Sequence, residues 1–177
     1  NTPAAAFFKT IGGVAFNAML ALFAGYIARS IADRPGFAVG FVGGMFAIKG
    51  TTFASLTDPN VALISSGFLG AIIAGFVGGY LVLLLGKLFN FLPKQLEGMK
   101  TILIYPVAGI LLIGAVMIFI NPYVSSINSG MNNFLSSMSG TNKILLGVIL
   151  GGMMSVDLGG PVNKAAYTFG TGMLAEG

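Results

Sequence analysis

Long stretches without a charged side chain restrict this chain more than any other feature. Uncharged runs cover 10–28, 35–48, 59–86, 101–142, 144–156 and 165–175. A helix that crosses a bilayer needs about 20 mostly apolar residues, and three segments meet that requirement: 11–32, 61–86 and 101–120. The apolar stretches 37–48 and 144–156 are shorter, which predicts short tilted spans, re-entrant segments or helices buried within protein.

The composition agrees with a membrane protein rather than a soluble one. Charged residues make up 8% of the 177 residues and apolar residues 55%, whereas about 25% of the residues of a soluble domain are charged. We therefore predict an all-α fold, a bundle of transmembrane helices that crosses the bilayer several times.

The residues that many soluble enzymes depend on are missing. The sequence has no Cys and no His, which removes thiolate chemistry, the commonest proton shuttle and the commonest metal ligand. It shows no nucleophile with a basic partner, no cluster of metal ligands and no Walker loop. We expect no cofactor, no metal and no catalysis by this chain alone. Its nine Lys and Arg lie scattered between apolar runs, which argues against nucleic acid binding.

The positions of the charges predict the orientation of the spans. The charged residues that follow the first and second spans are Arg29, Asp33, Arg34, Lys87, Lys94, Glu97 and Lys100. The positive-inside rule places both loops in the cytoplasm. An even number of crossings must then separate them, so the short segment 36–50 is predicted to cross outward. The loop 51–60 would face the outside, with Asp58 and Pro59 as turn formers.

The long uncharged run after the second loop combines two features. Pro106 lies within the span 101–120 and should kink or break its hydrogen-bond ladder. The segment 121–142 is rich in Ser and Asn, and on a helical wheel its apolar residues form one stripe: Tyr123, Val124, Ile127, Met131, Phe134, Leu135 and Met138. This pattern predicts an amphipathic helix at the membrane interface or against the bundle. The alternative is a polar loop, because Gly130 weakens a helix.

Glycine recurs at a spacing of four residues in three places. The glycines are Gly36, Gly40 and Gly44, then Gly75 and Gly79, then Gly147 and Gly151. In lipid, helices associate through close contact, and small residues four apart allow it. We expect tight helix packing at these positions, within the chain or between subunits. The alternative is that they are glycines of ordinary membrane-protein composition.

Most of the polar chemistry of the chain lies between Asp157 and Lys164. This stretch holds an acid, two glycines, a proline, an amide and a base between two apolar runs. Irregular backbone at membrane depth persists only where protein or water satisfies its polar groups. A broken hairpin is therefore predicted, with half-helix ends that direct backbone dipoles into a cavity.

The residues of this hairpin are candidates for a substrate site. Asp157 and Asn163 can accept hydrogen bonds from sugar hydroxyls, and Asn163 and Lys164 can donate them. Gly159 and Gly160 would let the backbone approach a ligand. The alternatives are that Asp157 and Lys164 pair and fix the turn, or that the stretch lies in an aqueous loop.

Three other positions carry weaker signals. Asn17 lies within an apolar span, where its amide either bonds a neighbouring helix or lines the substrate pathway. The segment Asp33–Gly36, with sequence DRPG, predicts a cytoplasmic turn with a structural or gating role. Lys49 either extends its side chain to the interface or faces the cavity.

Two segments resemble the fructose-type membrane component, enzyme IIC, of the bacterial phosphoenolpyruvate-dependent sugar phosphotransferase system. One is GYIARSIADRPGFAVGFVGG, from Gly25 to Gly44, and the other contains the pattern D-x-G-G-P-x-N-K-A-A-Y from Asp157 to Tyr167. The order of the spans between them is similar as well, so the resemblance covers nearly the whole chain. The second segment is the more specific of the two.

The resemblance implies a homodimeric sugar permease in the bacterial inner membrane. Such a permease binds fructose or a related hexose outside and presents it to a cytoplasmic IIB partner, which is phosphorylated on cysteine and modifies the sugar. The matching residues, and our candidates for the sugar site, are Asp157, Gly159, Gly160, Pro161, Asn163 and Lys164. The Asp33, Arg34, Pro35 and Gly36 turn matches the other family segment. We expect residues 1–177 to form a single transmembrane domain, a fragment of a longer IIC domain.

Two hypotheses from other classes compete with this one. The first is a proton- or ion-coupled secondary transporter that uses Asp157 as its coupling carboxylate, since burial can bring a carboxyl group into the working pH range. The second is a structural membrane subunit without a ligand. Uptake that depends on phosphoenolpyruvate would separate the permease from both.

Overall fold

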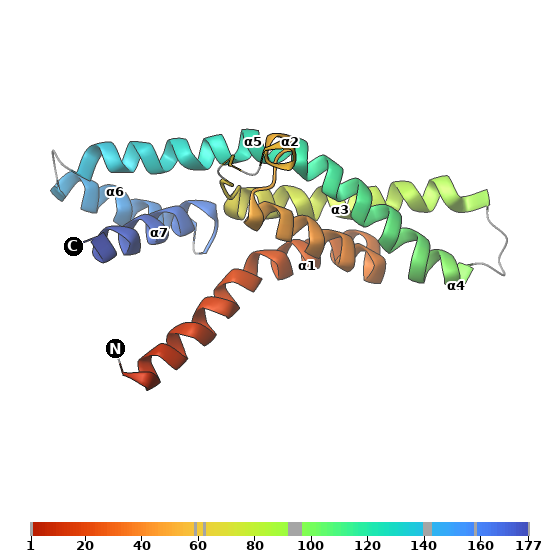
Figure 1. Cartoon of the computed structure of the whole chain (residues 1–177), viewed down its shortest axis with the longest axis horizontal. Coiled ribbons are helices and arrows are strands. Elements are labelled where there is room, and N and C mark those ends of the chain that lie inside the picture. The colour runs from red at the N-terminus through yellow and green to blue at the C-terminus, as the bar shows by residue number, and fades with distance from the viewer. Residues whose placement is uncertain are drawn as a thin grey trace.

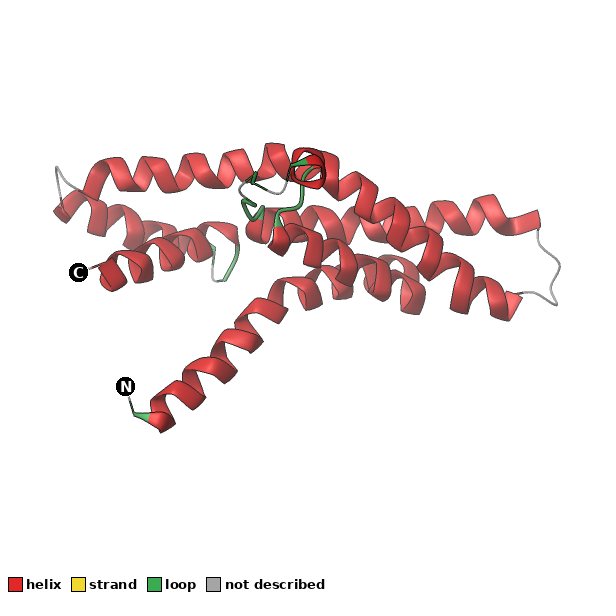
Figure 2. Ribbon diagram, in the orientation of Figure 1, coloured by secondary structure: helices red, strands yellow, loops and turns green. Residues whose placement is uncertain are grey.

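The computed structural model describes residues 2–58, 60–61, 63–91, 97–139, 143–157 and 159–176. Within these ranges every regular element is a helix (Figures 1 and 2). The elements are α1 (Pro3–Lys49), α2 (Phe53–Thr57), α3 (Gly67–Leu88), η1 (Phe89–Phe91), α4 (Glu97–Met99), η3 (Lys100–Ile104), α5 (Tyr105–Ser139), α6 (Lys143–Val156) and α7 (Pro161–Glu176). Helix α1, helix α3 and the run from η3 through α5 are long and apolar enough to cross a membrane. The predicted all-α bundle is confirmed.

Helix α1 consists of two arms that fold back on each other. Ala32 and Asp33 have non-helical backbone angles, so the first arm is 3–31 and the second is 34–49. Gly44 of the second arm lies so close to the first that an added Cβ would be 2.8 Å from the Ala21 Cα. The second arm therefore runs back along the first, as the topology argument requires for the segment 36–50.

Helix α3 packs into this hairpin through its own glycines. A Cβ at Gly78 would lie 3.2 Å from the Gly40 Cα, and one at Gly70 would lie 3.0 Å from the Ala47 Cβ. These two contacts make α3 antiparallel to the second arm. The turn at Asp33 and the C-terminal end of α3 are therefore at the same end of the bundle, which agrees with two loops on one side of the membrane.

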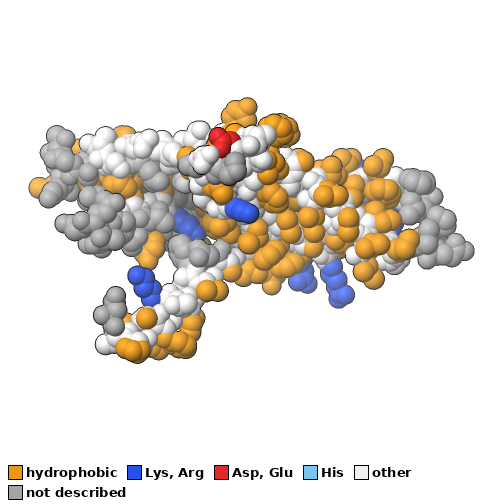
Figure 3. Space-filling model, viewed as in Figure 1, with side chains coloured by type: hydrophobic (Ala, Val, Ile, Leu, Met, Phe, Trp, Pro, Cys, Tyr) orange, Lys and Arg blue, Asp and Glu red, His pale blue; other side chains and the backbone are white. Residues whose placement is uncertain are grey.

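Small side chains form the interior, and large apolar side chains cover the outside. The buried hydrophobic residues of the first three spans are mainly alanines: Ala21, Ala24, Ala28, Ala32, Ala47, Ala71 and Ala74. Large side chains such as Leu84, Ile102, Leu111 and Phe119 are more than half exposed, and Figure 3 shows hydrophobic side chains over the bundle. This distribution is typical of helices that pack by close contact and face lipid.

The amphipathic helix predicted at 121–142 is the C-terminal part of α5, which continues from the preceding span to Ser139. Residues 140–142 lie outside the described ranges. The predicted stripe is only partly buried, because Val124 and Leu135 are buried but Ile127 is exposed. Figure 1 shows that α5 bends midway, where Pro122 interrupts the ladder.

The break expected at Pro106 takes a particular form. Residues Lys100–Ile104 form a π-helical turn, and the Tyr105 N–H donates to the Lys100 carbonyl. Pro106 comes directly after this turn, at the start of α5. The change of helix type therefore occurs where proline has no N–H to contribute.

Two boundaries differ from the sequence predictions. The loop 51–60 contains the short helix α2, because Thr52 and Ser55 form a reciprocal capping box. The second span begins at Gly67 rather than at 61, after a stretch without regular secondary structure at 63–66. Pro59, the predicted turn former, lies outside the described residues.

Candidate substrate site

Two short helices and the turn between them form the segment in which the sequence places the site. Helix α6 has 14 residues and α7 has 16, so each is about 21–24 Å long and falls short of a hydrocarbon core of about 30 Å. The two helices contact each other, and α7 also contacts α3 and α5. Figure 1 shows the turn directed toward the start of α3. The predicted helix–turn–helix is present.

Asp157 follows the last residue of α6, and its carboxylate caps the start of α7. Oδ2 accepts a hydrogen bond from the Val162 N–H at 3.0 Å, and Oδ1 accepts one from the Asn163 N–H at 2.7 Å. The first N–H groups of a helix lack partners within the helix, and the helix dipole favours a negative charge beside them. The carboxylate thereby fixes where α7 begins.

Asn163 makes the reciprocal contact to the preceding helix. Its Nδ2 donates to the Met154 carbonyl at 2.8 Å, and Met154 lies in the last turn of α6, where carbonyls lack partners within the helix. The Asp157 carboxylate thus binds the start of α7, and the Asn163 amide binds the end of α6. These two contacts hold the half-helix ends side by side.

The structure explains separately why each glycine and the proline occupies its position in the turn. Gly159 has φ +109°, a conformation that residues with a Cβ rarely adopt. A Cβ at Gly160 would collide with the Asp157 carboxylate. Helix α7 begins at Pro161, the position at which the missing proline N–H costs no helical hydrogen bond.

Lys164 lies one turn into α7 on the side that faces protein. Its backbone N–H donates to the Gly160 carbonyl at 3.1 Å, and its Nζ is enclosed by protein. The next two residues, Ala165 and Ala166, are buried. Eight residues therefore contain a carboxylate, an amide and an ammonium group. The carboxylate precedes α7, and the other two lie on α7, which packs against the bundle.

The comparison with known families gives a match over the whole chain. Residues 1–177 match the family model described as "Phosphotransferase system, EIIC". The chain belongs to this EIIC family.

The curated relatives of this EIIC chain are longer than it is. The chain is 46% identical over 178 residues to the "PTS system fructose-specific EIIABC component" of Bacillus subtilis (strain 168), covering 100% of this chain and 26% of the relative. It is 47% identical over 164 residues to the "Fructose permease IIC component" of Bacillus amyloliquefaciens, covering 92% and 49%. It is 46% identical over 175 residues to the "PTS system fructose-specific EIIB'BC component" of Escherichia coli (strain K12), covering 98% and 28%. The chain thus spans at most about half the length of these relatives. No solved structure matches it significantly.

The EIIC chain does not bring all of its candidate residues together. The turn of Asp33–Gly36 joins the two arms of α1, at the end of the bundle away from α6 and α7 (Figure 1). Its gating role stays a prediction. Asn17 lies in the first arm of α1, but its side chain is outside the described part of the structure, so its role also stays a prediction.

A buried polar cluster that the sequence analysis did not identify lies at the opposite end of the bundle from Asp33. Asn121 is completely buried. Its Nδ2 donates to the Phe46 carbonyl at 3.1 Å and to the Thr51 carbonyl at 2.8 Å, and its Oδ1 accepts from the Ser66 hydroxyl at 2.8 Å. The Ser66 N–H donates to the Ala47 carbonyl at 3.0 Å. One amide therefore joins α5, the second arm of α1 and the start of α3.

The sequence offered one weak signal for this cluster. Asn121 is a polar residue at the junction between an apolar span and a Ser/Asn-rich segment, and it precedes Pro122. Its partners are mostly backbone carbonyls on other elements, which no residue pattern identifies.

Proposed function

We propose that this EIIC chain contributes the sugar-translocating part of a fructose-type phosphotransferase permease, with its substrate site at the turn between α6 and α7. The observation that carries the proposal is the pair of helix ends held together by Asp157 and Asn163. Discontinuous helices of this kind form substrate sites in transporters, because their ends present backbone dipoles to a cavity. The names of the relatives, which specify fructose, support the substrate class.

The hydrogen-bond capacity of the turn suits a sugar. Each oxygen of the Asp157 carboxylate accepts one backbone N–H and retains a lone pair that can accept from a hydroxyl. Asn163 uses Nδ2 to hold α6, and its Oδ1 can accept a second hydroxyl. These groups are fixed by the hairpin before substrate arrives, which lowers the entropic cost of binding.

Phosphoryl transfer to the sugar requires a partner domain that carries the phosphate. The chain contains neither Cys nor His, and several relatives carry IIB designations in their names, EIIABC or EIIB'BC. We infer that a IIB phosphocarrier domain supplies the phosphate from the cytoplasmic side. Phosphorylation would then prevent the sugar from returning through the permease.

Location and assembly follow from the same assignment. The exposed apolar surface of the spans suits lipid, and the bacterial inner membrane is where a permease would meet cytoplasmic phosphocarriers. We further propose a homodimer. In the alternating-access cycle, the bundle that is packed through Gly40 and Gly78 moves as one body, and the α6–α7 turn changes its exposure relative to that body.

Uptake by inverted and right-side-out vesicles that contain the full-length permease tests the proposal. Accumulation of phosphosugar should require phosphoenolpyruvate and the soluble phosphocarriers. Asp157→Ala should abolish most of the uptake, and Asp157→Asn, which keeps one capping oxygen, should retain part of it. The matched control is Ser155→Ala, because Ser155 is exposed and bonds only the Gly152 carbonyl of its own helix among its described contacts.

Two results would contradict the proposal. Accumulation of free sugar on a proton gradient would favour the secondary-transporter hypothesis. The hydrogen bonds of Asp157 weigh against that hypothesis, because protonation would turn one accepting oxygen into a donor and break its bond to α7. Unchanged uptake in Asp157→Ala would leave the turn as a structural element without a ligand.

A further inference from the structure

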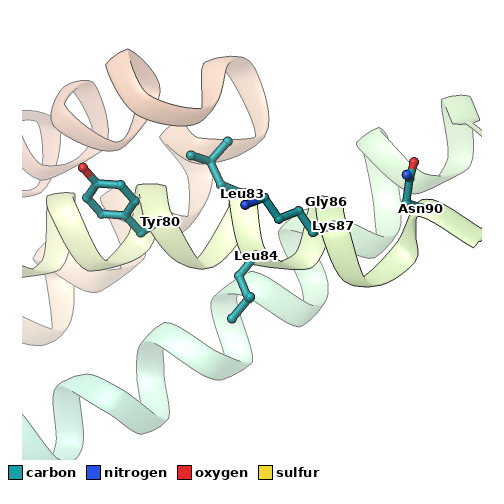
Figure 4. A pocket seen from close by; sticks show the side chains of 6 residues that line it. All are labelled: Tyr80, Leu83, Leu84, Gly86, Lys87 and Asn90. Atoms are coloured by element: carbon teal, nitrogen blue, oxygen red, sulfur yellow. The ribbon is translucent and has the colours of Figure 1, made fainter.

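A groove on the outer face of α3 has a composition that changes along its length. Its wider part has a volume of about 560 Å³ and is lined by Tyr80, Leu83, Leu84, Gly86, Lys87 and Asn90 (Figure 4). A second hollow of about 280 Å³ continues from it along the helix, lined by Phe76, Val77, Tyr80, Leu81 and Leu84. Both hollows share Tyr80 and Leu84, so together they follow α3 for more than three turns. One end is polar and the other is apolar.

The polar end carries the positive charge of Lys87. Figure 4 shows the Lys87 side chain extended back along α3 toward Leu83, so that its ammonium group lies within the groove. Tyr105 of α5 lies beside Gly86, because its hydroxyl would be 3.6 Å from a Cβ at that position. The Lys100 Nζ lies 5.8 Å from the centre of the same Tyr105 ring, but Lys100 is buried and does not line the groove. A ligand in the groove would therefore meet the positive charge of Lys87.

The rest of the groove suits a hydrocarbon chain. Tyr80 and Leu84 are about 60% exposed, and Phe76, the last large side chain along the groove, is 48% exposed. The groove opens sideways from a spanning helix, toward the region that lipid occupies. Its polar end lies at the end of α3 that the positive-inside rule assigns to the cytoplasm, where the leaflet is rich in anionic lipid.

We propose that this groove binds an anionic phospholipid, with the phosphate at Lys87 and an acyl chain along Leu84, Tyr80 and Phe76. Three features together select this ligand: a cation at the interfacial end, an apolar path that runs from it into the membrane, and a lateral opening. A sugar would leave the apolar path unused. A soluble phosphate would use only the Lys87 end.

Native mass spectrometry of the full-length permease, with defined lipids added in detergent, tests the site. The wild-type protein should retain phosphatidylglycerol in preference to phosphatidylcholine. Lys87→Gln should reduce retained phosphatidylglycerol about five-fold, since one basic residue near the surface contributes about 1 kcal/mol to anionic lipid binding. Lys87→Arg should preserve it. The matched control is Lys49→Gln, because Lys49 is also exposed at a helix end but lies at the other end of the bundle.

The same experiment distinguishes the other possible occupants. Equal retention of the two lipids, or equal loss in Lys87→Gln and Lys49→Gln, would overturn the proposal. So would full competition by inorganic phosphate, which has no acyl chain. A single-cysteine variant Leu84→Cys should remain uncrosslinked in membranes. A disulfide-linked dimer of that variant would show that a second copy covers the groove instead.

Discussion

Asp33 has the most unusual backbone conformation at the scale of single residues. Its φ of 53° and ψ of −148° make it the one positive-φ residue other than glycine in the described part of the chain. This region of backbone space is one that essentially only glycine adopts without strain, and such strain persists where surrounding packing imposes it. Here the two arms of α1 meet on either side of the residue, so the close contact of the arms sets the angle.

We expect Asp33→Gly to be tolerated and Asp33→Val to be destabilising. Glycine removes the steric conflict, whereas a β-branched residue at positive φ increases it. The difference in unfolding free energy between the two variants should be about 1–3 kcal/mol. Thermal unfolding of the purified protein in detergent measures it. Equal stability of the two variants would mean that Asp33 does not hold this conformation.

Asn121 is the second residue whose replacement should lower the stability of the bundle. Asn121→Ala removes three hydrogen bonds made by a fully buried side chain. The Phe46 carbonyl keeps the Gly50 N–H and the Ser66 hydroxyl keeps the Ala47 carbonyl, but the Thr51 carbonyl loses its one described donor, and an unsatisfied buried group costs about 1–3 kcal/mol. Asn128→Ala is the matched control, since Asn128 is only half-buried and makes one described bond of 3.4 Å to Ser65. Equilibrium unfolding should separate the two variants. Similar losses of stability in the two variants would mean that Asn121 does not join three elements.

At the scale of elements, glycine spacing determines which helices approach closely. The glycines at 36, 40 and 44 face the first arm of α1, and those at 75, 78 and 79 face the α1 hairpin. The pair at 147 and 151 behaves differently, because nothing described lies within 4 Å of a Cβ built at either position. Glycines four residues apart therefore form helix contacts in the second arm of α1 and in α3, whereas those in α6 face open space.

Gly40→Ala should destabilise the bundle, and Gly147→Ala should not. A methyl group at Gly40 would come within 2.5 Å of the Ala28 Cβ, and overpacking of this kind costs about 1–3 kcal/mol. At Gly147 the methyl group enters open space, and alanine is the better helix former by about 1 kcal/mol. Melting temperatures of the two variants should shift in opposite directions. A loss of stability in Gly147→Ala would show that α6 packs tightly against another surface.

The sequence predicted elements better than it predicted contacts, for a physical reason. Apolar length and charge placement decide where a span lies, so the return of the segment 36–50 along the first span and the helix–turn–helix around Asp157 could both be inferred. Where a helix continues is decided by tertiary packing, and α5 therefore runs through Pro122 although the pattern suggested two separate helices. The bonds of Asn121 link residues that are up to 75 apart in sequence, and no local pattern encodes such partners.

At the scale of the whole molecule, a glycine-packed bundle carries a short hairpin whose polar turn is fixed by its own side chains. The bundle consists of both arms of α1, α3 and the first half of α5, and the hairpin of α6 and α7 contacts α3 and α5. Such a division suits a permease, because one packed body can stay intact while the exposure of a small polar turn changes. The proposed substrate site requires that this turn face a water-filled chamber that sugar can enter.

Cysteine accessibility tests that claim most directly, since this chain has no cysteine of its own. The full-length permease, with any other cysteine replaced, would carry one cysteine at Val162, the half-buried second residue of α7 whose N–H bonds Asp157, or, as a control, at Val148, which is 67% exposed on the face of α6. In membrane vesicles, a charged thiol reagent should label Val162→Cys, fructose should protect it, and Val148→Cys should stay unlabelled. If Val162→Cys resists the reagent, or reacts equally with and without fructose, the turn does not line a sugar chamber.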